Sequence, residues 1–233
     1  MAAILRVYGI MLLKGMGQTL LMTLLTLVIA TIIGMIFGLM NVGRNRILNL
    51  IGTVYVDAIR GVPLIVLAYF VFFGIPAGMQ GMGMRGFRLS ALQAGTIALS
   101  LNCGAYMAEI IRAGIESVDR GQMEASRSLG LSYGSSMALV VVPQAVRTMI
   151  PSIINQFIIT LKDTSILSVI AFPELTLIGK TISGNTLKPL QSWAIVGVMY
   201  MIVIITLSKL AKRIERRVNR GRSEERRVGK ECR

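Results

Sequence analysis

The chain has 233 residues, of which 54% are hydrophobic, and an excess of lysine and arginine gives it a formal net charge of +14. Soluble domains average roughly 45–50% apolar residues, so this composition, with a mean hydropathy of +0.68, excludes an ordinary soluble core and indicates a membrane protein. The basic residues interrupt apolar runs instead of gathering on one polar segment, so the charge does not indicate nucleic-acid binding.

Several kinds of chemistry are missing from the sequence. It has no histidine, and its two cysteines, Cys103 and Cys232, stand far apart. A His/Cys metal site, a CxxC redox pair and histidine-based acid–base catalysis are therefore excluded. The chain also lacks a Gly-x-x-x-x-Gly-Lys-Ser/Thr loop for nucleotide phosphates. We expect no enzymatic activity and no cofactor on this chain, so that any ATP and Mg are bound by another one.

Five apolar stretches are long enough to cross a bilayer, which takes about 20 residues. We expect an all-α integral membrane domain with spans at residues 17–40, 54–75, 89–111, 149–171 and 193–210. The first stretch is longer than the apolar core of a signal peptide and has no clear cleavage site after it, so we expect it to be retained. Ala30, Gly34 and Gly38 recur at every fourth position there, which predicts close packing of another helix.

Glycines and prolines define the expected boundaries between the spans. Residues 74–86 contain five glycines and Pro76, which predicts an extracytoplasmic turn region and not a helix. Pro143 and Pro151 are expected to frame a break before the fourth span. Two alternatives to this count stay open: residues 132–142 as a sixth, short membrane segment, and residues 1–13 as an interfacial helix.

The basic residues outside the spans are distributed unevenly between the two sides of the membrane. One side holds twelve of them: Arg44, Arg46, Arg112, Arg120, Arg127, Arg147, Lys209, Lys212, Arg213, Arg216, Arg217 and Arg220. The other side holds six: Arg6, Lys14, Arg85, Arg88, Lys180 and Lys188. Cytoplasmic loops carry the excess of positive charge, so we expect the N-terminus outside and the C-terminus in the cytoplasm.

The segment 117–143 is polar and amphipathic although it lies between long apolar runs, and the charge distribution places it in the cytoplasm. A membrane protein that keeps such a segment is expected to dock a soluble partner there. We expect Gly121 to end one helix, Glu124 to lie in the first turn of the next, and Gly130 to close that helix after about two turns. The alternative is an ordinary amphipathic surface helix.

Four segments in order resemble the polar amino acid uptake permeases, a subfamily of ABC importers for glutamine, histidine, arginine and related substrates. They are residues 19–39, 55–76, 98–132 and 141–170. Within 121–143, the pair Glu124-Ala125, then Gly130 and finally Pro143 have the spacing of the EAA loop of these permeases. Ser126 stands where that loop often has a second alanine, and Val142 where it often has leucine.

The resemblance implies a permease subunit of the type I ABC importer class in the bacterial cytoplasmic membrane, with alternating access from an extracytoplasmic solute-binding protein to the cytoplasm. It implies two ATPase subunits and a second permease subunit, identical or related, as partners. It also implies a coupling helix whose contacts with the ATPase come from Glu124, Ala125, Ser128, Leu129 and Gly130. An ion-coupled carrier, which normally shows internal repeats, and a membrane scaffold are the alternatives.

Polar residues inside the expected spans are candidates for the substrate pathway, because a charge at the bilayer centre costs at least about 2.5 kcal/mol. Asn102, Tyr106 and Glu109 share one face of the third span. On the fourth span the candidates are Lys162, Asp163, Thr164 and Ser165. The two charged neighbours point about 100° apart, so each needs another partner.

Structural ion pairs are the competing interpretation of these charges. Glu109 stands three residues before Arg112, and Asp57 three residues before Arg60. For the second pair we favour the structural role. An interhelical pair is the alternative for Lys162 and Asp163. The acidic candidates indicate only a slight preference for a cationic amino acid.

The last residues have the appearance of an addition. RSEERRVGKEC, which begins at Arg222, resembles the in-frame translation of a sequencing adapter. We therefore expect a transmembrane permease domain at 1–221 and a non-native, irregular tail at 222–233. A genuine charged tail is the alternative.

Overall fold

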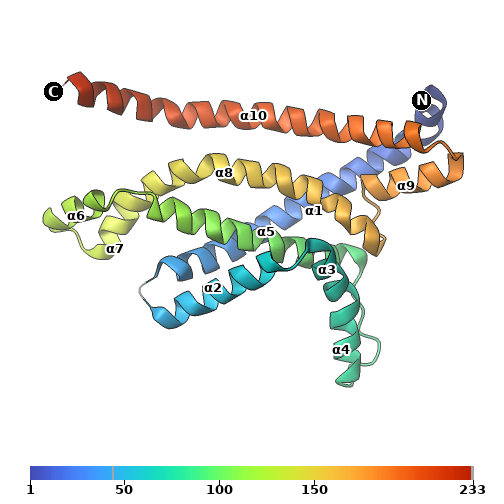
Figure 1. The fold of residues 1–233 in the computed structure, drawn as a ribbon, viewed down its shortest axis with the longest axis horizontal. Coiled ribbons are helices and arrows are strands. Elements are labelled where there is room, and N and C mark those ends of the chain that lie inside the picture. Colours follow the sequence, from blue (N-terminus) through green and yellow to red (C-terminus); the bar gives the residue numbers. More distant parts are fainter. Residues whose placement is uncertain (44, 232–233) are drawn as a thin grey trace.

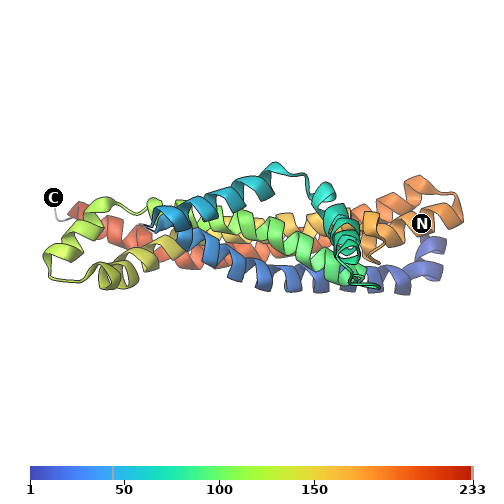
Figure 2. The same cartoon turned by 90° about the horizontal axis from the view of Figure 1, so that it is seen from below.

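The computed structural model describes residues 1–43 and 45–231, and every regular element in this part of the chain is helical (Figure 1). The all-α expectation is confirmed. Most of the molecule is an elongated bundle of long helices, and both views show them running lengthwise (Figures 1 and 2). These helices are α1 (Ala2–Val42), α2 (Arg46–Gly61), α5 (Ala91–Glu116), α8 (Val142–Asp163) and α10 (Pro189–Glu231).

Shorter elements occupy the two ends and one side of the bundle. α6 (Arg120–Ser128) and α7 (Tyr133–Ser136) lie at the end that also holds the C-terminus, whereas α9 (Leu175–Thr186) lies beside the N-terminus at the other end (Figure 1). α3 (Leu64–Tyr69), a π-helical turn (Phe70–Gly74) and α4 (Ile75–Gly81) form one arm that projects from the side of the bundle, transverse to its long helices (Figures 1 and 2). The predicted coupling segment and the N-terminus are therefore at opposite ends.

Five helices of the described residues are long and apolar enough to cross a membrane, which confirms the predicted number. They are Ala3–Val42, Leu64–Gly81, Ala91–Glu116, Tyr133–Ile170 and Pro189–Arg213. Each of the five overlaps one predicted span, the second only over residues 64–75. The first also includes residues 3–13, so that segment continues α1 and does not form a separate helix.

The second predicted span, 54–75, is wrong as a single helix. It combines the end of α2 with α3, and the chain is extended between them at Val62, with φ −101° and ψ 129°. The ring of Pro63 disfavours the α conformation at the preceding residue, which explains the break. The turn region predicted at 74–86 is wrong in its first half, because Ile75–Gly81 is helical and Pro76 occupies its first turn, where no N–H is needed.

The break predicted between Pro143 and Pro151 is also wrong. Pro143 lies in the first turn of α8 and Pro151 within it. The π-helical turn Met137–Val141 joins α7 to α8 without interruption, so 132–142 leads into the fourth span and is not a sixth one. Proline is tolerated in membrane helices where neighbouring helices and local π adjustments satisfy the freed carbonyls.

The backbone of the expected tail is helical as far as Glu231, in contrast to the irregular structure we expected for it. Arginine, lysine and glutamate dominate residues 222–231, and all three favour helix over coil. Continuation of α10 is therefore explained by local propensity and does not test whether the tail is native. Cys232 lies outside the described residues.

The small residues of α1 pack against α5 as predicted. Ala30 is buried, and a Cβ built on Gly34 would lie 2.5 Å from the Cβ of Met107. A Cβ on Gly38 would lie 2.9 Å from the carbonyl oxygen of Ala108. Only hydrogen fits at the two glycines, so the two backbones approach closely and α5 is fixed along the length of α1.

A buried carboxylate anchors α9 at the opposite end of the molecule. Glu174 is fully buried and accepts hydrogen bonds from the backbone N–H of Thr176 at 2.7 Å and of Leu177 at 2.6 Å, which caps the helix. The hydroxyl of Tyr200 on α10 donates to the same carboxylate at 2.9 Å. The cap therefore also ties α9 to α10.

A leucine at position 34 should separate α1 from α5. Overpacking a tight contact costs typically about 1–3 kcal/mol, so we expect Gly34→Leu to lower the thermal unfolding temperature of the detergent-purified protein. Gly17→Leu is the matched control, because a Cβ there meets nothing within 4 Å on the same helix. Equal unfolding temperatures for the two variants would contradict this account of the packing.

Candidate functional site

A cavity of about 510 Å³ lies where α2, α3, α5 and α8 meet. The break between α2 and α3 contributes residues 60–64, α5 contributes Asn102 and Tyr106, and α8 contributes Gln156, Ile159 and Asp163. Positions three or four apart on a helix share one face, so each of these two helices turns a single face to the cavity. Small-molecule pockets measure about 300–1,000 Å³, so the volume is suited to a small solute.

The structure brings together three of the predicted pathway residues on this cavity: Asn102, Tyr106 and Asp163. Asp163 is on a different helix from the other two and stands more than fifty positions after them in the sequence. Glu109 does not line it and instead lines a second cavity of about 360 Å³, further along α5.

Three other predicted pathway residues line neither of these two cavities. Lys162 is exposed and is not among the residues that line the cavity with Asp163. Thr164 is buried and donates its hydroxyl to the carbonyl oxygen of Leu161 at 2.7 Å. Ser165 is half-buried in the 3₁₀ turn that follows α8. Their roles in transport stay predictions.

Sequence reasoning missed Arg60 and Gln156 as cavity residues. The structural pair favoured for Arg60 and Asp57 is not formed; the guanidinium lies over the ring of Tyr106, with its Cζ 5.1 Å from the ring centroid. The sequence did contain a signal for Arg60: the proline three residues after it ends α2 and so places the arginine at a helix terminus. Gln156 had a signal as well, since it stands seven residues before Asp163 and therefore on the same face.

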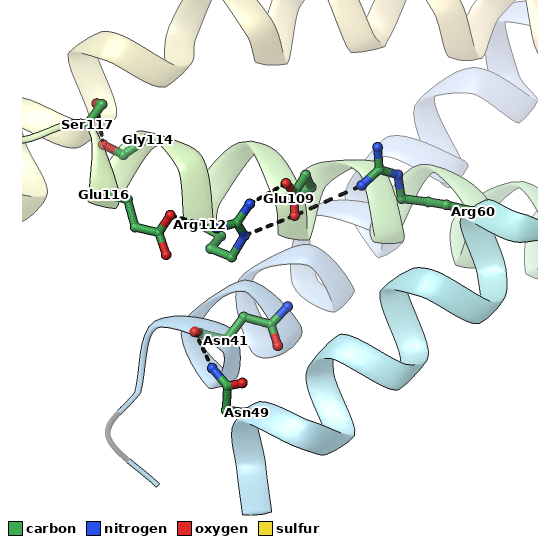
Figure 3. Close-up of polar contacts among 8 residues, drawn as sticks. All are labelled: Asn41, Asn49, Arg60, Glu109, Arg112, Gly114, Glu116 and Ser117. Carbon is green, nitrogen blue, oxygen red and sulfur yellow. Dashed lines mark hydrogen bonds and ion pairs between the residues drawn. The ribbon is translucent and has the colours of Figure 1, made fainter. Parts of the chain in front are cut away.

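A cluster of charges follows the cavity along α5 (Figure 3). Arg112 donates to Glu109 from Nε at 3.0 Å and from Nη2 at 2.5 Å, and from Nη1 to Glu116 at 2.6 Å. The ion pair of Glu109 with Arg112, an alternative at the sequence level, is thus present. Arg60 reaches the edge of this cluster, with its Nη1 4.0 Å from Oε2 of Glu109.

The predicted coupling segment folds as α6 followed by a tight turn. Asp119 accepts a hydrogen bond from the backbone N–H of Gly121 at 2.7 Å and so caps the start of the helix. Two details of the prediction are wrong: Gly121 lies inside α6 and ends no helix, and Glu124 lies beyond the first turn. The capping acid is Asp119, whose side chain is short enough to reach back to the helix N-terminus.

Gly130 closes α6 as predicted. Its φ is +85°, in the left-handed region that favours glycine. Its N–H donates to the carbonyl of Arg127 at 3.0 Å, and the N–H of Leu131 donates to that of Ser126 at 3.3 Å. This pair of bonds is the Schellman motif, which satisfies the last carbonyls of a helix and reverses the chain.

The two faces of α6 differ sharply. Ser126 is buried and donates its hydroxyl to the carbonyl of Met123 at 2.8 Å, and Met123 packs on an apolar cluster of α5 and α8. The predicted coupling residues are all exposed: Glu124, Ala125, Ser128, Leu129 and Gly130. Leu129 has 84% of its surface exposed. A leucine so exposed at a polar end of the molecule is suited to contact a protein partner.

The glycine at position 130 and the one at position 134 should respond in opposite ways to alanine. An L-residue in the left-handed region costs roughly 1–2 kcal/mol, and since a Cβ at Gly130 meets nothing within 4 Å, that cost is conformational only. Gly134 is helical and equally unobstructed, so alanine there gains up to about 1 kcal/mol. We expect the backbone amide of Leu131 to exchange faster in Gly130→Ala and the same amide to exchange more slowly in Gly134→Ala. A shift in the same direction for both would contradict the assigned conformation.

Comparison with known proteins agrees with this geometry. The family model for binding-protein-dependent transport system inner membrane components matches residues 30–220. The probable glutamine ABC transporter permease protein GlnM of Bacillus subtilis is 35% identical over 90% of this chain and 94% of its own length. The glutamine transport system permease protein GlnP of Escherichia coli K12 is 35% identical over 89% and 93%.

A solved structure is similar over nearly the same length. The crystal structure of an amino acid ABC transporter with histidines shares 37% sequence identity and superposes with a TM-score of 0.83, covering 90% of this chain and 95% of that one. The helical architecture is therefore that of a type I ABC importer permease. The chain belongs to the family of binding-protein-dependent transport system inner membrane components, as a membrane-spanning permease subunit.

Proposed function

We propose that this chain is the permease subunit of an ATP-driven importer for polar amino acids in the bacterial cytoplasmic membrane. The observation that carries the proposal is the pair of opposite charges, Arg60 and Asp163, on one cavity of about 510 Å³ between membrane helices. Every amino acid carries a carboxylate and an ammonium group. A cavity that offers one cation and one anion has the charges that such a zwitterion needs.

The remaining walls of the cavity are suited to the same ligand. Asn102 and Gln156 supply amide donors and acceptors, Tyr106 supplies a phenol, and Ile159 is apolar. Charge-assisted hydrogen bonds to arginine and aspartate are the strongest of these contacts, at about 1.5–3 kcal/mol each. Both named relatives are glutamine permeases by name, and the similar solved transporter is described with histidines. These names support amino acids as the substrate class.

The orientation follows from charge. α6 and the C-terminus lie at one end of the molecule and the N-terminus at the other (Figure 1), and the excess of lysine and arginine supports the first end as cytoplasmic. Substrate then enters from an extracytoplasmic binding protein at the N-terminal end and leaves toward α6 by alternating access. A second permease subunit, identical or related, completes the pathway.

The cytoplasmic end docks two ATPase subunits, which bind the ATP and Mg that this chain does not. The exposed face of α6 supports this contact, with Leu129 as its apolar centre and Gly130 leaving room for close approach. A carrier that works without partner subunits would leave this leucine, with 84% of its surface exposed, without a contact.

Loss of the negative charge of Asp163 should impair transport. We expect Asp163→Asn to lower uptake per assembled complex by roughly an order of magnitude in proteoliposomes that contain the ATPase and binding protein, because a charge-assisted bond worth about 1.5–3 kcal/mol is lost. Lys162→Gln is the matched control, since Lys162 is the exposed neighbour that lines neither cavity. A purely structural Asp163 predicts lower yield of the complex with normal uptake per complex.

Truncation of Leu129 should uncouple the ATPase from the permease. We expect Leu129→Ala to leave the subunit in the membrane while substrate-stimulated ATP hydrolysis falls several-fold, because the apolar contact with the ATPase is lost. Ile10→Ala is the control, as Ile10 is similarly exposed, at 74%, but lies near the N-terminus at the other end of the molecule. Unchanged stimulation in Leu129→Ala would reject the assignment of α6 as the coupling helix.

A further inference from the structure

A second cavity of about 360 Å³ lies beside the first and nearer to α6. The first cavity is lined by Asn102 and Tyr106 of α5, and the second by Glu109, Arg112 and Glu116 of the same helix. From position 102 to position 116 the helix advances roughly 21 Å, at about 1.5 Å per residue. The two cavities therefore follow one another along α5 in the direction in which the substrate is proposed to leave.

Arg60 is the one residue that lines both of these cavities. Its guanidinium is held loosely, by the ring of Tyr106 at 5.1 Å and by Glu109 at 4.0 Å, a separation longer than a hydrogen bond. Arg112, by contrast, makes three hydrogen bonds to two carboxylates, which hold it in place (Figure 3). Arg60 is thus the cation that has donors to spare for a ligand in either cavity.

Each cavity opposes Arg60 with its own carboxylate. The first holds Asp163, and the second holds Asp57, one turn before Arg60 on α2. Asp57 is exposed to the second cavity and has no hydrogen-bond or ion-pair partner among the described residues. Since Glu109 and Glu116 are both engaged by Arg112, Asp57 and Arg60 are the two opposite charges of this cavity that remain for a ligand.

A buried amide on the wall of the second cavity also lacks a partner. The side chain of Asn41 is 7% exposed, and its Oδ1 is buried without a hydrogen bond. Asn49 donates from Nδ2 to the backbone carbonyl of Asn41 at 2.6 Å (Figure 3), which leaves the side-chain amide of Asn41 unused. Buried polar groups are normally paired, but this oxygen is packed against Gly52 of α2, where an added Cβ would collide with it, so it marks the close contact of α1 with α2 at the cavity wall.

We propose that the second cavity is an exit site for the transported amino acid, and that Arg60 hands the ligand over. Arg60 keeps its contact with the carboxylate of the ligand while the ammonium group of the ligand passes from Asp163 to Asp57. Both charges of the substrate therefore have a partner throughout. This inference rests on the proposed amino acid transport and adds to it a second site and the residue that the two sites share.

Cysteine reporters in the two cavities test the exit site directly. Thr53→Cys places a thiol in the second cavity and Ile159→Cys one in the first, each in a Cys232→Ser background where the buried Cys103 is kept. The assembled transporter in detergent is treated with a maleimide, with and without millimolar glutamine. We expect glutamine to slow labelling at both reporters, by about twofold at each if the ligand divides its time equally between them, since one ligand occupies the two cavities in turn.

Charge variants then assign the partners. We expect Asp57→Asn to abolish protection at Thr53→Cys while protection at Ile159→Cys stays, and Arg60→Gln to abolish both. Arg112→Gln removes the same charge from a residue of the second cavity alone, so protection at Ile159→Cys should survive it. Glutaminamide, which lacks the carboxylate, should protect neither reporter.

The outcomes separate the two proposals. Protection of Ile159→Cys without protection of Thr53→Cys overturns the exit site and leaves amino acid transport standing. Protection of neither reporter by glutamine or by any other polar amino acid overturns the proposed substrate cavity and the exit site with it. Protection of both that survives Arg60→Gln overturns the shared role of Arg60.

Discussion

The close approach of α1 and α5 is the contact on which the rest of the structure depends. Gly34 and Gly38 have no space for a Cβ against α5, and dispersion at such short distances replaces the hydrophobic driving force that helices lack in lipid. α5 is thereby held in a fixed position in the centre of the bundle. Both cavities lie along it, and α6 follows directly from its end.

Polar groups in the bundle fall into two sets that differ in whether they are satisfied. Thr160 of α8 donates to the sulfur of Cys103 on α5 at 3.2 Å, and the hydroxyl of Tyr55 donates to the carbonyl of Leu101 at 2.8 Å. These bonds tie helices together and leave nothing over for a ligand. Asp57, by contrast, has no partner among the described residues, and Arg60 only loose ones. Charges without a fixed partner on the wall of a cavity are available to a ligand, which is why they indicate function.

Sequence periodicity was sufficient to predict the number of spans, the packing face around Gly34 and the turn at Gly130, because each depends on local spacing or on one residue's conformational freedom. It failed at Val62, where the proline that follows breaks the helix although the apolar run continues. It also failed at Pro143, where a π-helical turn lets the helix continue in spite of the proline. It also missed Arg60 as a cavity residue. That role depends on where the end of α2 meets α5, a contact between distant segments that no local pattern encodes.

The position of α6 explains how a force on it can reach the cavities. Met123, on its buried face, packs on a cluster that includes Ile111 of α5 and Met149 of α8. α5 lines both cavities, and α8 lines the first. A Cβ on Gly114 of α5 would collide with the side chain of Met149, so the two helices are in tight contact just above α6. Packed interiors transmit displacement and do not absorb it. A partner that moves α6 must therefore move α5 and α8 as well, and with α8 the carboxylate of Asp163 on the wall of the first cavity.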